Sequence, residues 1–223
     1  LMALRKNESY LNQRLKQMSK YIPLHCHSHY SLLDGLSKPA SIAERITNLE
    51  LDGCAITDHG NITCSIQFHK AMQAAKKKSI QGCELYLSNG PCTEKTPANR
   101  KLFHQVVLAK NLQGWKSLIK MTSDSNSSDR LYYRPRLDYK YFEEHRPDGI
   151  ITFSGHLGSR LANVAQSGTK QDVIKEAEYL RDLFGKENFF IEIQLIDSVL
   201  NDDARIIGDI LREVAVITGI PCV

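Results

Sequence analysis

Short apolar runs alternate with amphipathic stretches along the chain, and this alternation constrains the fold more than any other sequence feature. The apolar runs predict strands at 22–24, 54–57, 80–87, 103–109, 149–155, 189–196 and 220–223. Helical periodicity predicts helices at 39–49, 66–77, 114–126, 157–166, 172–184 and 204–218. Strands that alternate with helices are typical of βα units, so we expect an α/β fold with a parallel sheet or barrel.

The chain of 223 residues contains no linker or low-complexity tract, which favours a single domain. We interpret residues 1–20 as a polar N-terminal extension, either disordered or not native to the protein. Residues 21–223 would then form the domain. Because the sequence stops where a last strand begins, we expect this domain to be incomplete at its C-terminus.

The composition indicates a soluble cytoplasmic protein with no membrane partner. The sequence contains no apolar stretch long enough to span a bilayer and no apolar signal core. The six cysteines are scattered without a CxxC pair, which fits reduced thiols better than a disulfide framework. The net charge of +4 permits a polyanionic partner but does not identify one.

The stretch LHCHSHYSLLDG contains the first candidate metal ligands. Because side chains alternate along a strand, His25 and His27 are expected on the same side. For such a pair taken singly, exposed edge histidines are the commoner explanation. The pattern becomes informative because nearly every predicted strand carries a similar side chain at or near one end: Asp34, His59, Glu84, His104 and His156.

In a β/α barrel the loops that follow the strands form the active face, so these seven side chains are expected to converge. Mixed histidine and carboxylate ligands suit zinc, manganese or iron, and seven groups exceed what one ion binds. A cluster of several ions is suited to phosphoester hydrolysis. Asp58, which precedes His59, is expected to point away from the ions and to have a structural role.

The motifs LHCHSHYSLLDG, AITDHGN, IQGCELYL and YYRPRLD are similar to those of the polymerase and histidinol phosphatase (PHP) domain. The form they resemble lies at the N-terminus of the alpha subunit of bacterial DNA polymerase III. The resemblance implies a distorted, TIM-like (β/α)7 barrel, truncated at its C-terminus. It also implies two or three divalent ions (zinc, manganese, iron or magnesium) bound by His25, His27, Asp34, His59, Glu84 and His104. His156 stands where the family usually has a cysteine.

The same resemblance implies a fragment of a DNA-directed DNA polymerase, a nucleotidyltransferase whose polymerase active site and last two PHP ligands lie beyond residue 223. We expect a 3'-5' exonuclease or proofreading activity in the intact protein. Its partners would be DNA, the rest of the polymerase polypeptide, and replisome subunits such as a proofreading exonuclease or a sliding clamp. Two alternatives remain open: a catalytically silent scaffold of the polymerase, and a stand-alone PHP phosphatase.

Basic and aromatic residues are interleaved between residues 130 and 146, a composition suited to single-stranded nucleic acid. Arg134 and Arg136 are the candidate DNA or phosphate contacts in this stretch. A solvated loop, or aromatic residues that cover the barrel, would explain the same composition without DNA.

Overall fold

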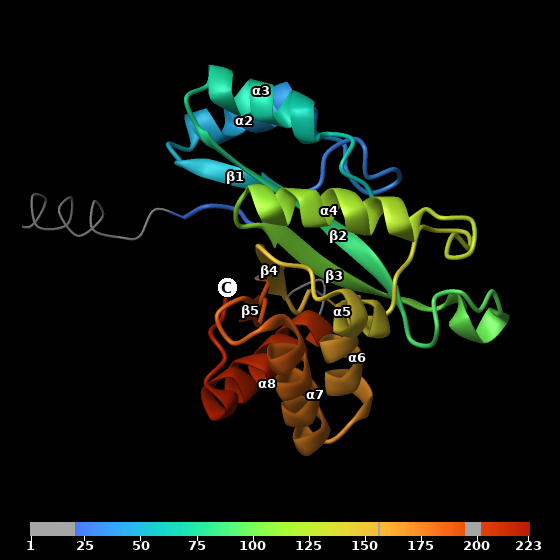
Figure 1. Cartoon of the computed structure of the whole chain (residues 1–223). Coiled ribbons are helices and arrows are strands. Elements are labelled where there is room, and N and C mark those ends of the chain that lie inside the picture. The colour runs from blue at the N-terminus through green and yellow to red at the C-terminus, as the bar shows by residue number, and fades with distance from the viewer. Residues whose placement is uncertain (1–20, 156, 195–201) are drawn as a thin grey trace, which may run out of the picture.

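The computed structural model describes residues 21–155, 157–194 and 202–223, and the labels used below are those of Figure 1. The extension predicted at residues 1–20 lies outside the described residues. In the described part, five strands form one sheet in the order of the sequence, β1-β2-β3-β4-β5. They are β1 (Gly53–Ile56), β2 (Lys78–Ser88), β3 (Leu102–Ala109), β4 (Ile150–Phe153) and β5 (Phe189–Phe190).

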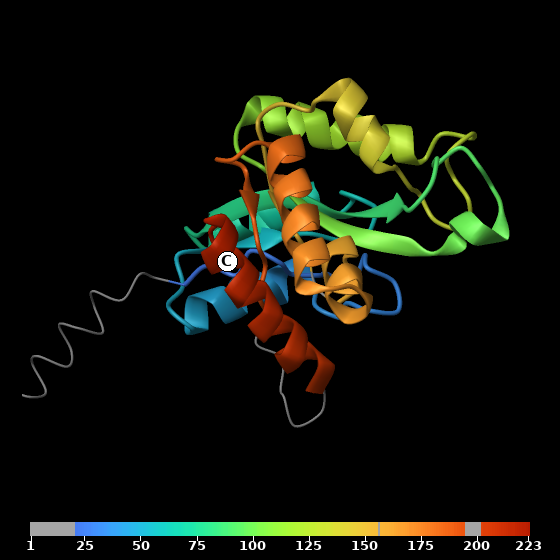
Figure 2. The ribbon, with the colours of Figure 1, turned by 90° about the horizontal axis from the view of Figure 1, so that it is seen from below.

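Helices surround this sheet in two groups (Figure 1). Near β1 lie α2 (Pro39–Asn48) and α3 (Ser65–Ala74), while α4 (Leu112–Ser125) runs across β2 and β3. The second group gathers beside β4 and β5, and Figure 2 shows two of its helices, α7 and α8, from below. It comprises α5 (Tyr139–His145), α6 (Arg160–Ser167), α7 (Lys170–Phe184) and α8 (Asp202–Thr218). None of the helices in the described ranges is long and apolar enough to cross a membrane.

The α/β class is confirmed, but the strand directions differ from those of simple βα units. The pairs β1–β2 and β4–β5 are parallel, whereas β2–β3 and β3–β4 are antiparallel. The connection from β2 to β3 carries only a short 3-10 helix, Pro97–Arg100, and β3 and β4 are separated by two helices. A parallel pair requires a crossover, usually helical, and the β2–β3 connection has no α-helix. The number of helices does not decide the direction of β3 and β4, since β4 and β5 are also separated by two helices and are parallel.

The first predicted strand, residues 22–24, is extended backbone beside β1 without a complete ladder. Ala55 donates its N–H to the carbonyl of Pro23 (2.8 Å), and Thr57 donates to the carbonyl of Cys26 (2.8 Å). Proline has no N–H to return to the ladder, and the N–H of Cys26 binds the Thr57 hydroxyl instead. The segment therefore lies against β1 without being a regular strand.

The predicted strand at 189–196 is shorter than expected, because only Phe189 and Phe190 pair with β4. Beyond them the chain changes partner. Ile191 forms a parallel bridge with Cys222, and Ile193 donates its N–H to the carbonyl of Val223. The last apolar run of the sequence is thus placed beside the end of β5, while residues 195–201 lie outside the described ranges.

Strand alternation divides the apolar side chains between two sides of the sheet. The odd-numbered residues of β2 (Cys83, Leu85 and Leu87) join the large cluster that includes side chains from α4 to α8. On the opposite side, Ala55, Val106, Leu108 and Phe153 form a smaller cluster across the strands. Glu84 and Tyr86 alternate with the odd residues of β2 and therefore belong to this second side. The candidate metal centre lies there.

Candidate metal centre

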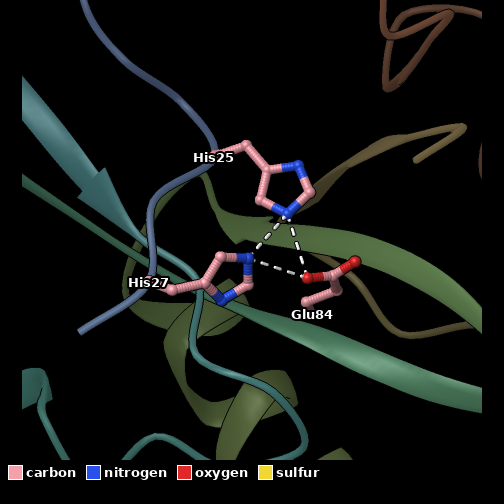
Figure 3. Close-up of side chains that lie close together, drawn as sticks. All are labelled: His25, His27 and Glu84. Carbon is pink, nitrogen blue, oxygen red and sulfur yellow. Dashed lines mark hydrogen bonds and ion pairs between the residues drawn. The ribbon is translucent and has the colours of Figure 1, made fainter. Parts of the chain in front are cut away.

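His25 and His27 lie in the extended segment beside β1, and their rings approach each other closely. Their Nε2 atoms are 3.2 Å apart, and Figure 3 shows both rings turned toward Glu84. A second contact holds the His27 ring, whose Nδ1 lies 3.2 Å from the hydroxyl of Ser31. Alternation along an extended segment thus places both imidazoles on the side expected from the sequence.

Glu84 lies at the middle of the histidine cluster and is only 2% exposed. Its Oε2 atom lies 3.0 Å from His25 Nε2 and 3.1 Å from His27 Nε2. The same oxygen is 3.3 Å from His59 Nδ1, while Oε1 is 2.8 Å from His104 Nδ1. One buried carboxylate therefore contacts four imidazoles.

His104 joins the cluster because β2 and β3 are antiparallel. It stands near the start of β3 and pairs with Tyr86, two residues after Glu84. In a parallel pair the first residues of β3 would lie beside the start of β2, far from the end that carries Tyr86. The strand that places His104 beside Glu84 thus runs in the direction opposite to the one assumed from the sequence.

The loop that carries Asp34 closes the other side of the cluster. Asp34 Oδ2 lies 3.1 Å from His59 Nε2 and 3.8 Å from His27 Nδ1. Asp58 does not face the cluster: its buried carboxylate accepts hydrogen bonds from the backbone and hydroxyl of Ser28 and from the hydroxyl of Ser31, each 2.7 Å long. The structural role expected for Asp58 is thus the anchoring of this loop.

The side chains form three overlapping groups whose ligand atoms lie within 4.8 Å of one another. These groups are His25–His27–Glu84, His27–Asp34–His59 and His59–Glu84–His104. Ligands bound to one zinc ion at about 2.0–2.1 Å in a tetrahedron lie about 3.3 Å apart. The separations of 3.0–3.3 Å between Glu84 Oε2 and the His25, His27 and His59 nitrogens agree with that spacing. The donor set fits divalent ions bridged by a carboxylate.

Electrostatics in the cluster favour an ionised carboxylate at Glu84. Burial alone would raise its pKa, but hydrogen bonds from His104, His25 and His27 hold the pKa well below its usual range. For His25, burial is outweighed by hydrogen bonds to Glu192 and Glu84, and its pKa rises to about 10. Burial lowers the pKa of His59. The cluster thus places four imidazoles against one buried carboxylate, while Asp34 and His104 at its edge remain partly exposed.

The remaining predicted residues separate into three cases. His156 lies outside the described residues. Arg134 is exposed and close to the cluster, because its Nη1 donates to the hydroxyl of Tyr86 (2.8 Å), whose ring stacks on His59. Arg136 corrects the prediction of a DNA contact: it is fully buried, and it donates to the carbonyls of Cys92, Glu94, Asn99 and Arg130. A side chain enclosed in this way cannot contact DNA.

Two residues beside the cluster were missed by the sequence analysis. The Tyr86 ring contacts both His59 and the Arg134 guanidinium, and its position two residues after Glu84 could have placed it on the same face. Glu192 lies beyond β5 and contacts His25 from the side opposite Glu84. Its alternation with buried neighbours in FFIEIQ was visible, but its partner across 167 positions was not.

Comparison with known families agrees with this geometry. A family model described as "PHP domain" matches residues 23–195. The chain belongs to the PHP domain family. It is also 34% identical over 205 residues to the DNA polymerase III subunit alpha of Treponema pallidum, and 33% identical over 187 residues to that of Deinococcus radiodurans. These alignments cover 91% and 80% of the chain, but only 17% and 14% of the two relatives. The chain therefore spans less than a fifth of their length.

Solved structures share the fold of this PHP domain at low identity. A putative metal-dependent phosphoesterase from Bifidobacterium adolescentis superimposes with a TM-score of 0.54 at 11% identity, covering 90% of this chain and 85% of its own. An amidohydrolase from Chromobacterium violaceum gives a TM-score of 0.56 at 14% identity, covering 90% and 84%. The chain is thus a PHP domain in both sequence and fold, homologous to the N-terminal part of DNA polymerase III alpha subunits.

Proposed function

We propose that this PHP domain hydrolyses phosphodiester bonds with two or three divalent ions, as a 3'-5' exonuclease within a replicative DNA polymerase. The observation that carries the proposal is the sharing of Glu84 between two of the three overlapping ligand groups. A carboxylate common to two groups is suited to bridge neighbouring ions. Histidine and carboxylate ligands leave zinc, manganese, iron and magnesium as candidates.

The ions would be held by His25, His27, Asp34, His59, Glu84 and His104, and we retain His156 as a further ligand. When bound, they would activate water at neutral pH and neutralise negative charge on the phosphate. The protein itself supplies the orientation of the ligands. Asp58 fixes the loop of Asp34, and the Ser31 hydroxyl lies against the ring of His27.

Arg134 is the residue that we propose to contact the substrate phosphate. Its guanidinium lies 5.1 Å from the centre of the Tyr86 ring, and that ring stacks on the candidate ligand His59. The Arg134 side chain is exposed to solvent, so its guanidinium lies at the edge of the cluster and is not buried in it. An arginine at this edge can bind a phosphate oxygen with two N–H groups while the ions bind the others.

The polymerase context rests on the relatives, which are named as alpha subunits of DNA polymerase III. By that homology we propose that DNA is the substrate and that the rest of a polymerase polypeptide is the main partner. Replisome subunits such as a proofreading exonuclease and a sliding clamp would be further partners. A replicative polymerase of this kind would act in the cytoplasm.

The test is to measure metal content by mass spectrometry and nuclease activity on primed DNA, in the full-length protein and in a His25→Ala, His27→Ala double variant. We expect two or three transition-metal ions per chain, and loss of metal and of nuclease activity in the variant. A folded protein without metal or nuclease activity would instead identify the domain as a scaffold of the polymerase. Activity on a small phosphate monoester but not on DNA would identify a PHP phosphatase.

A further inference from the structure

Glu192 is a buried carboxylate beside the candidate ligands that the proposed metal set does not include. It stands two residues after the end of β5 and is 7% exposed. Its backbone N–H donates to the hydroxyl of Ser154 (3.0 Å), just beyond β4. The residue is also held by its neighbours on both sides, because Ile191 and Ile193 bond to the last residues of the chain. Its backbone is thus fixed by two adjacent segments.

The side chain of Glu192 is directed at His25. Glu192 Oε1 lies 2.6 Å from His25 Nδ1, and it also accepts a hydrogen bond from Gln194 Nε2 (2.8 Å). Its second oxygen, Oε2, is buried and has no hydrogen-bond partner among the described residues. Burying a carboxylate without sufficient partners is costly, and the contact that accounts for its position is the one to the imidazole.

His25 is therefore contacted at both ring nitrogens, by groups with different roles. Nδ1 faces Glu192 Oε1 at 2.6 Å, with Gln194 Nε2 farther away at 3.1 Å, while Nε2 faces Glu84 and the Nε2 atom of His27. A metal-binding imidazole commonly donates its other N–H to a carboxylate, which fixes both the tautomer and the orientation of the ring. The arrangement around His25 has this form.

We propose that Glu192 is a positioning residue of the metal centre: it accepts the Nδ1 proton of His25 and thereby directs the Nε2 lone pair of that ring toward the ion. This inference rests on the proposed metal function. Gln194 contributes by donating to the same oxygen, which fixes the carboxylate in the orientation that meets the ring. Glu192 itself is not counted as a ligand in this arrangement, because its Oε1 is engaged by His25 and Gln194 and it belongs to none of the three ligand groups.

The decisive measurement is the dissociation constant of Zn²⁺, by chelator competition, in the full chain and in Glu192 variants. Glu192→Met preserves the side-chain length but removes the acceptor, so we expect zinc to bind about 10–100-fold more weakly. Glu192→Gln keeps an amide oxygen that can accept from Nδ1, and its affinity should stay closer to that of the unchanged protein. Glu176→Met serves as the matched control, since Glu176 pairs with Arg160 between α6 and α7, and it should leave the zinc affinity unchanged.

A double-mutant comparison separates an effect through His25 from a direct effect on the ion. In a His25→Ala background, Glu192→Met should weaken zinc binding by less than about twofold, because the residue through which it acts is gone. An equal loss in both backgrounds would make Glu192 a ligand in its own right and overturn the inference. An unchanged affinity in Glu192→Met would overturn it as well.

If Glu192→Met does not fold, as judged by circular dichroism, the inference can be tested on the unchanged protein by determining the tautomer of His25. In the zinc-loaded protein, ¹⁵N NMR of labelled histidine should show His25 protonated at Nδ1 and bound to the metal through Nε2. The opposite tautomer would contradict the inference. Failure of the unchanged protein to bind any metal would instead refute the proposed function, so the two failures are distinguishable.

Discussion

At the scale of single residues, Glu84 is the side chain that makes the most contacts with the candidate ligands. It is buried, ionised and within 3.3 Å of nitrogens from His25, His27, His59 and His104. No other described carboxylate contacts as many imidazoles. Its negative charge is therefore the feature that holds the histidine rings together before any ion binds.

Glu84→Gln should abolish binding at two of the three ligand groups. The amide is neutral and presents only one oxygen, so it can neither bridge two ions nor balance their charge. We expect at least a 100-fold loss of zinc affinity, measured by chelator competition, with a folded protein by circular dichroism. Glu187→Gln, at an exposed position after α7, is the control. Retention of full metal content in Glu84→Gln would show that the ions are bound elsewhere.

The two arginines predicted to contact DNA or phosphate show that burial decides whether a charged side chain is available to a ligand. Arg134 and Arg136 are two positions apart in the same motif, yet one is exposed beside Tyr86 and the other is completely enclosed by backbone carbonyls. A guanidinium that has exchanged water for carbonyl acceptors stabilises a fold and is unavailable to a ligand. Charge alone could not distinguish the two roles.

Arg134→Ala should weaken binding of single-stranded DNA and raise KM for a DNA substrate by about 10-fold, with zinc content unchanged. This magnitude corresponds to the loss of one charge-assisted contact of about 1.4 kcal/mol. Fluorescence anisotropy and steady-state nuclease kinetics would measure it. Arg205→Ala on α8, whose side chain is exposed, controls for the loss of one positive charge. An identical effect of both changes would rule out a specific contact at Arg134.

At the scale of elements, the loop from Ser28 to Gly35 is built to hold Asp34 against His59. Asp58 binds Ser28 and Ser31 inside it, and the N–H groups of Asp34 and Gly35 both donate to the Ser31 carbonyl. The loop thus has a rigid internal framework although its surface is exposed. Precise placement of a ligand from a loop requires such support.

Gly35→Ala should disturb this framework, because a Cβ atom at position 35 would lie 2.0 Å from the carbonyl oxygen of Ser28. The loop must move to relieve that overlap, and it carries Asp34 with it. We expect zinc affinity to fall about 10-fold or more, measured by chelator competition. At Gly208 in α8 a Cβ would have no neighbour closer than 3.7 Å, so Gly208→Ala should not alter zinc binding. Equal affinities in the two variants would contradict the role assigned to the loop.

The sequence predicted which segments are helices or strands more reliably than it predicted how those segments pair and in which direction. The apolar runs at 54–57, 80–87 and 103–109 became β1, β2 and β3, because buried strands need continuous apolar side chains. The helix α5 was missed within a stretch interpreted as a charged loop, although Asp138 caps it by accepting the N–H of Tyr141. Its aromatic residues Tyr141 and Phe142 are buried in the large cluster. That agrees with the alternative in which aromatic residues cover the fold.

Residue type and strand alternation were enough to expect some of the candidate site's side chains on one face, whereas contacts that depend on long-range pairing could not be expected from the sequence. Alternation along extended backbone predicts the side on which the side chains of His25, His27 and Glu84 lie. The position of Glu192 depends on the distance between β5 and the segment beside β1, which no local pattern contains. The antiparallel direction of β3 likewise depends on the tertiary structure, although it is what brings His104 to Glu84.

At the scale of the whole molecule, the site joins segments that are distant in sequence. The candidate ligands come from the segment beside β1, the following loop, the end of β1, β2 and β3, and Glu192 adds the segment after β5. The helices divide between two apolar clusters, one around α2 and α3 and one that includes α4 to α8. An ion at the site would therefore connect the β1 side of the molecule to the β3 side by coordination bonds.

Metal loading should consequently stabilise the whole fold rather than the site alone. An ion that binds only the folded state adds about 2.7 kcal/mol at a concentration 100 times its dissociation constant. For a chain of this size that corresponds to a rise in Tm of roughly 5–10 °C. Differential scanning calorimetry with Zn²⁺, then with excess chelator, should show the rise and its reversal. The His25→Ala, His27→Ala variant should show no rise, because two ligands of the shared groups are gone. A rise of the same size in that variant would mean that zinc stabilises the fold from another site, and the link between the two sides of the molecule would then have to be sought in packing alone.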